Sequence, residues 1–121
     1  RNPYLSLFDS ADPNVSIERR QPTVTPTQAL FLMNSEFVHD QADGLAKRIV
    51  SAETTTQQRM QLAFELVHGR QPSKQDFDAA VNFVTTYPEQ LSGQDQAASE
   101  QLAWSALARV ILTSNSFLFV D

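Results

Sequence analysis

With 121 residues, of which 41% are hydrophobic and 19% charged, the chain fits one globular domain with a real core, and this composition excludes a disordered or low-complexity chain. The net charge is −5, and residues 71–101 carry five carboxylates against Lys74 alone, which argues against nucleic-acid binding. The absence of cysteine excludes disulfides, thiolate metal sites and covalent haem attachment within these residues. No apolar run approaches the ~20 residues that a membrane span needs.

Residues 1–24 are predicted to form an extended or irregular arm. Asp9-Ser10 and Asp12-Pro13 are turn formers, because such short side chains bond to the backbone just ahead of them. Pro22 disfavours helix in the residue before it. A short, weak strand pattern covers Val15–Glu18.

Five helices are predicted to follow the arm. Thr25-Pro26, Asn34-Ser35, the threonines at 54–56 and Ser73 supply helix starts, and Gly69 supplies a left-handed helix end. The predicted bounds are Pro26 to about Met33, Glu36 to about Ser51, the threonines to Gly69, Ser73 to Pro88, and Gln96 to about Ser114 after a loop at Leu91–Gln94.

Apolar residues recur at helical spacing in each of these segments, which predicts one buried stripe per helix. The inward residues are predicted to be Ala29, Leu30, Leu32, Met33, Phe37, Val38, Ala42, Leu45, Ala46, Ile49, Met60, Ala63, Phe64, Val67, Phe77, Ala80, Val81, Val84, Ala103, Ala106, Leu107, Val110 and Ile111. The fold class is therefore mainly α: a compact bundle of about five helices (residues 25–121) preceded by an extended N-terminal arm (residues 1–24), as one domain. Because the chain opens on arginine rather than methionine, we interpret it as a fragment of a larger protein.

Arg19 and Arg20 are the most interesting charged pair. Neighbouring arginines ahead of the helix start at Thr25-Pro26 suit an anion site, since a helix start presents free N–H groups. The favoured alternative is structural pinning, in which the arginines pair with Asp9, Asp12 or Glu18 and hold the arm on the bundle. Asp9 and Asp12 miss the spacing and the glycine of a calcium loop, so turn stabilisation is preferred for them.

The two histidines give no catalytic signal. His39 has Asp43 one turn later, but no third metal ligand follows at a known spacing, so a solvated helix surface is preferred. His68 precedes Gly69, where it suits the end of a helix dipole. The sequence therefore predicts no catalytic residue and no metal site in this segment.

Three blocks carry a family resemblance. FDSADPNVSIERRQPTVTPTQALFLMNSEFV (residues 8–38) resembles the conserved block of the planctomycete-specific C-terminal domain, which is found in large proteins with a cytochrome-c-like front portion. LVHGRQPSKQDF matches its Gly-Arg-x-Pro turn, and AWSALARVILTSNSFLFVD resembles its ending. The resemblance implies a domain of unknown function in exported proteins, whose genes often lie near sulfatases and polysaccharide-degradation functions. The chain departs from the parent architecture in lacking Cys-x-x-Cys-His, so any haem belongs to an upstream domain.

The leading functional hypothesis is a non-catalytic helical module with a structural or interaction role in a larger exported protein. Its contact surfaces are predicted in the arm, at Tyr4, Leu5, Leu7 and Phe8, and in the tail, at Phe117 and Phe119. The expected partners are neighbouring domains of the same polypeptide and a polysaccharide, and the expected compartment, from the resemblance only, is periplasmic, cell-envelope or extracellular. The alternatives are part of an enzyme acting on polysaccharide-type substrates whose site is completed upstream, and a small anion- or glycan-binding module.

Overall fold

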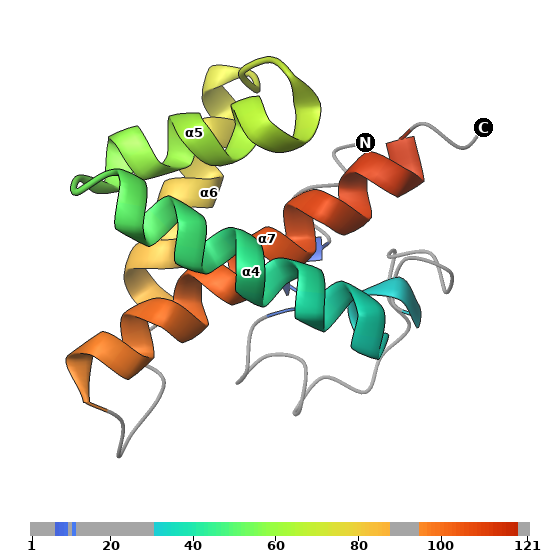
Figure 1. The fold of residues 1–121 in the computed structure, drawn as a ribbon. Helices are drawn as coiled ribbons and strands as arrows, with labels where there is room; N and C mark the ends of the chain where they lie inside the picture. Colours follow the sequence, from blue (N-terminus) through green and yellow to red (C-terminus); the bar gives the residue numbers. More distant parts are fainter. Residues whose placement is uncertain (1–6, 10, 12–30, 88–94, 119–121) are drawn as a thin grey trace.

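The computed structural model describes residues 7–9, 11, 31–87 and 95–118, with side chains of the last helix described as far as Ser114 (Figure 1). Its long helices are α4 (Glu36–Ala52), α5 (Thr56–His68), α6 (Lys74–Thr86) and α7 (Gln96–Leu118). Helical backbone also covers Leu7–Asp9, Ala11 and residues 31–33, and no strand occurs in the described ranges. The prediction of a mainly α fold is confirmed.

Hydroxyl side chains begin α4, α5 and α6. Ser35 Oγ accepts the Val38 N–H at 3.1 Å, Thr55 Oγ1 accepts the Gln58 N–H at 3.1 Å, and Ser73 Oγ accepts the Asp76 N–H at 3.2 Å. Each bond satisfies one of the N–H groups that a helix start leaves without an intrahelical acceptor. The predicted caps at Ser35 and Ser73 are confirmed, and the threonine joint resolves to Thr55.

Gly69 ends α5 as predicted. Its φ of 75° is left-handed, and its N–H donates to the Glu65 carbonyl at 2.9 Å. Gly44, the other described glycine, lies within α4, where a Cβ atom would meet no atom of the other described elements within 4 Å. Adding a side chain should therefore change the free energy of unfolding differently at the two glycines.

Alanine substitutions at these glycines are expected to act with opposite signs. Gly44→Ala should raise the free energy of unfolding by about 0.5–1 kcal/mol, because alanine is the better helix former and finds open space. Gly69→Ala should lower it by about 1 kcal/mol, because a side chain strains the left-handed backbone. Urea unfolding of the two variants measures both changes. Changes of the same sign would show that the two glycines do not differ in backbone conformation and available space.

α7 is the central helix of the bundle. It contacts α4, α5 and α6, and Figure 1 shows α4 crossing in front of it. The side chains from Ala103 to Ala108, and those of Val110, Ile111, Thr113 and Ser114, are buried. Alanines on both helices, including Ala42 and Ala46 of α4, leave little side-chain bulk between α4 and α7. The inward stripe predicted for the last helix is therefore confirmed as buried. The buried surface of α7 is wider than that stripe, because α4, α5 and α6 all contact this helix.

Three further predictions about the fold are corrected. Leu7 and Phe8 are helical and buried in the core, with 1% and 6% of their surface exposed, so they do not form an extended, exposed contact surface. Phe8 instead stacks on Phe83, with ring centroids 5.0 Å apart. Phe37 is 72% exposed rather than inward, and α7 continues past Ser114 to Leu118.

Several sequence-based expectations lie outside the described residues. They are the weak strand at Val15–Glu18, the helix start at Thr25-Pro26, the inward Ala29 and Leu30, and the loop at Leu91–Gln94. The division into an arm at residues 1–24 and a bundle at residues 25–121 also stays a prediction.

Candidate functional site

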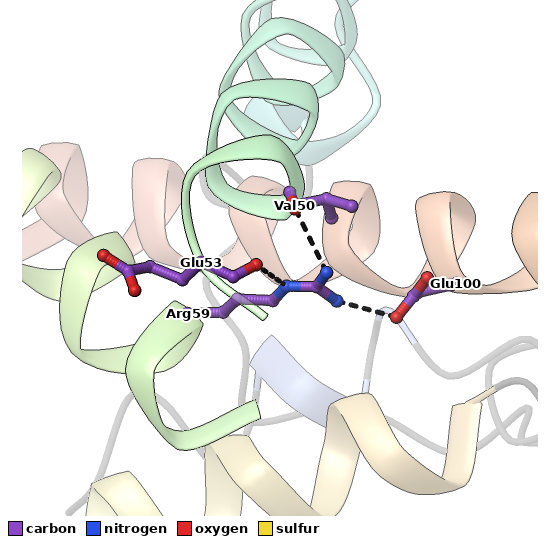
Figure 2. A network of polar contacts seen from close by, with 4 residues as sticks. All are labelled: Val50, Glu53, Arg59 and Glu100. Atoms are coloured by element: carbon purple, nitrogen blue, oxygen red, sulfur yellow. Dashed lines mark hydrogen bonds and ion pairs between the residues drawn. The ribbon is translucent and has the colours of Figure 1, made fainter. Parts of the chain in front are cut away.

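Arg59, in the first turn of α5, donates hydrogen bonds from all three of its side-chain nitrogens. Its Nε donates to the Glu53 carbonyl at 2.7 Å, and its Nη2 donates to the Val50 carbonyl at 3.0 Å (Figure 2). Its Nη1 donates to Glu100 Oε2 at 2.7 Å and forms an ion pair with that carboxylate. One guanidinium thus joins the last turn of α4, the start of α5 and the N-terminal part of α7.

The role of Arg59 follows from these acceptors. The last carbonyls of a helix have no intrahelical donor and carry partial negative charge, so a cation there is stabilising. The side chain of Arg59 is 11% exposed and that of Glu100 is 47% exposed, so the arginine is shielded while its partner keeps water contact. With all three nitrogens donating to protein acceptors, this guanidinium serves to hold helices together.

A second polar group joins the middle of α4 to α7. Ser105 Oγ donates to Asp43 Oδ1, and Gln101 Nε2 donates to the Asp43 carbonyl at 3.5 Å. Burial lowers the pKa of Arg109, an effect that the charges of Tyr87 and Asp43 oppose. Arginine stays protonated near neutral pH despite such a decrease. Hydrogen bonds from Ser105 and Gln101 therefore hold Asp43 against α7, and its negative charge interacts favourably with Arg109.

Apolar side chains are exposed at the N-terminal end of α4. Phe31 and Phe37 are each 72% exposed, well above Leu66 at 37% and Leu102 at 43%. Phe31 lies in the short helical stretch before Ser35, and Phe37 lies in the first turn of α4. We call these two residues the aromatic end of the module. Such side chains are common at surfaces that contact another protein.

The outward face of α4 continues from Phe37. Gln41, Gly44 and Arg48 follow it at i+4, i+7 and i+11, the spacing of one helix face, and all are exposed. Asp40 is exposed beside this line. Within the described residues, neither Asp40 nor Arg48 forms an ion pair. The face therefore offers an aromatic ring, a bare glycine and two opposite charges to a partner.

Few of the residues predicted for a site fall within the described ranges. Asp9 is helical and exposed, and Asp12, Arg19, Arg20 and Tyr4 lie outside the described residues. Phe117 lies within α7, where only its backbone is described, and Phe119 lies beyond the described ranges. Both the anion-site and the pinning hypotheses for Arg19 and Arg20 therefore stay predictions.

The histidines occupy structural positions. His39 is half-buried on α4, and His68, in the last turn of α5, stacks on Phe64 with ring centroids 5.8 Å apart. In the described part of the chain, no three histidine, aspartate or glutamate side chains cluster closely enough to hold a metal ion.

None of the described helices is both long and apolar enough to cross a membrane.

Sequence reasoning missed Arg59. Its acceptors lie 6, 9 and 41 residues away along the chain, so no short motif contains them. One signal does exist, because Arg59 lies four residues before the inward Ala63 and thus has a charge on the buried face of a helix. A buried charge requires hydrogen-bonding partners.

The comparisons with known proteins identify one family. The model of PSD1, described as "Protein of unknown function (DUF1553)", matches residues 1–84, which is more than half of the chain. The match spans the aromatic end, α4, α5 and most of α6. No curated protein and no solved structure matches the chain.

Proposed function

We propose, from the premise that this chain belongs to the DUF1553 family of proteins of unknown function, that it is a non-catalytic helical interaction module. In this role it binds neighbouring protein domains and holds them in a defined relative position. The observation that carries the proposal is the aromatic end, where Phe31 and Phe37 each keep 72% of their surface in water. Fully burying one such ring is worth about 1.5–3 kcal/mol, which favours a partner that covers it.

The polar side chains of the described core support the same proposal. Arg59 donates from all three nitrogens to groups on α4 and α7. Ser105 donates its hydroxyl proton to Asp43, so this contact also joins two helices. Hydrogen-bonded groups of this kind fix the relative positions of helices. A rigid bundle with an apolar end is the arrangement that a docking module needs.

The partner that we propose for Phe31 is a neighbouring domain of the same polypeptide. The resemblance to proteins with a cytochrome-c-like front portion supports this choice, and we propose that any haem belongs to that upstream domain. On the same support, we propose that the assembled protein is exported to the periplasm, cell envelope or exterior, and that a polysaccharide is among its partners.

Hydrogen exchange measured by mass spectrometry tests this docking. The amides of residues 31–35, including the Asn34 and Ser35 N–H groups that close the turn before α4, should exchange more slowly in the longer polypeptide than in residues 1–121 alone. We expect a slowing of at least ~10-fold, because covering an exposed turn removes its local opening. Phe31→Ser in the longer polypeptide should abolish the difference.

Leu102→Ser is the matched control, because Leu102 is also partly exposed, at 43%, but lies on α7. It should leave the protection of residues 31–35 unchanged. Equal exchange of residues 31–35 in the two contexts would reject the proposed docking.

A further inference from the structure

The outward face of α4 carries opposite charges at its two ends. Asp40 lies four residues before Gly44, and Arg48 lies four residues after it. Both side chains are exposed, and neither makes an ion pair within the described part of the chain. They are eight residues apart on one helix, which is beyond the reach of an i, i+4 pair. Their charges therefore remain available to a partner.

The symmetry of this pattern identifies the kind of partner. If a second α4 crosses the first in the antiparallel direction at Gly44, residue 40 of each copy faces residue 48 of the other. Two identical ion pairs then form about one two-fold axis, which is how a self-complementary surface pairs. Antiparallel helices also place opposite ends of their dipoles together.

Gly44 gives an independent reason for the crossing point. Glycine is a poor helix former, yet a Cβ at this position would meet no atom of the other helices in the described part of the chain within 4 Å. Neither close packing within the chain nor a positive φ requires glycine here. The absence of a side chain lets another helix approach closely. A helix crossing at Gly44 would therefore explain a glycine that the fold of the single chain does not require.

Phe37 fits the same arrangement. It lies seven residues before Gly44, and the antiparallel pairing places it opposite Ser51 of the second copy. Ser51 is small and exposed, and the neighbouring Ala52 is exposed as well, so that end of α4 can accept an aromatic ring. The pairing thus covers the exposed Phe37 and leaves Phe31 to the neighbouring domain.

We infer that the outward face of α4 is a dimer interface, on which a second copy of this chain binds antiparallel across Gly44 through two Asp40–Arg48 ion pairs. The inference rests on the proposed function, because it names the partner of Phe37 in the interaction module. A single pair of crossing helices buries less than the ~1,600 Å² of a standard interface, so the dimer is weak and depends on concentration.

Sedimentation equilibrium of the 121-residue chain over a range of concentrations tests the interface. Asp40→Arg and Arg48→Asp should each weaken dimerisation at least ~10-fold, because each places like charges opposite one another. The double variant D40R/R48D restores opposite charges and should return the affinity to within ~3-fold of the original. Glu65→Arg and Arg70→Asp make the same charge changes at exposed residues off α4 and should leave the affinity unchanged.

A second readout uses the absence of cysteine from the chain. Gly44→Cys places one thiol of each copy at the proposed axis, so oxidation should give a disulfide-linked dimer faster than oxidation of Glu65→Cys does. A chain that stays monomeric, a double variant that fails to recover affinity, or equal cross-linking at positions 44 and 65 would each overturn the inference. Protection of residues 31–35 in the longer polypeptide is measured separately, so docking can hold where the dimer fails.

Discussion

Replacing Arg59 with methionine is expected to lower the free energy of unfolding by about 2–4 kcal/mol, the largest effect of any single charged residue in the described structure. Methionine keeps much of the apolar stem, so the change isolates the guanidinium. The loss combines the hydrogen bonds to the carbonyls of Val50 and Glu53 with the ion pair to Glu100. We discount the ion pair, because the Glu100 side chain is 47% exposed and water screens it. Urea unfolding monitored by circular dichroism measures the change.

Two control variants separate the parts of this network. Glu100→Gln removes the charge but keeps an acceptor at a half-exposed position, so we expect a loss of no more than about 1 kcal/mol. Lys74→Met breaks the Lys74–Asp78 pair, in which the hydrogen bond to Asp78 raises the pKa of Lys74. Both of those side chains are largely exposed, so no measurable loss is expected. If Arg59→Met cost no more than Lys74→Met, the linking role of Arg59 would be refuted.

Replacing Phe8 with alanine is expected to cost about 3–5 kcal/mol, as for other buried aromatic residues. Phe8 is 6% exposed and stacks on Phe83, which in turn packs against Tyr87 with ring centroids 5.3 Å apart. The variant leaves a cavity between the N-terminal helical residues and α6. Since domains of this size are stable by about 5–15 kcal/mol, much of the stability would be lost.

Phe37→Ala is the matched comparison, because it makes the same chemical change at a residue that is 72% exposed. It should alter the free energy of unfolding by no more than about 0.5 kcal/mol. Thermal or urea unfolding of the two variants side by side gives the difference directly. A small, equal effect of both substitutions would show that residues 7–9 do not belong to the core.

The helix limits could be predicted because they depend on residues a few positions apart. Ser35 and Ser73 each accept an N–H three residues later, and Gly69 supplies the left-handed end of α5. The apolar spacing also identified most of the inward side chains of α5 and α6, including Met60, Phe64 and Val84. Local hydrogen bonds and helical periodicity are contained in the sequence itself.

Phe37 and Phe8 show where that reasoning ends. Phe37 lies next to Val38 at the edge of an apolar stripe, and periodicity alone does not say how wide a strip the neighbouring helices cover. In α4 the covered strip includes Ala42, Ala46 and Ile49 but stops short of Phe37. Phe8 lies among turn formers, and only its contact with Phe83, 75 residues later in the numbering, makes it a core residue.

The sequence by itself determined the helical class, the caps and the apolar stripes, because these arise from contacts within one or two turns of chain. The tertiary structure alone decided which charge is buried, which aromatic rings stay exposed and which face of α4 is left open. Arg59 acquires its role from Glu100, 41 residues away, and the outward face of α4 is defined by where α7 covers that helix. Such contacts depend on how the helices cross, and that is set by the packing of the whole bundle.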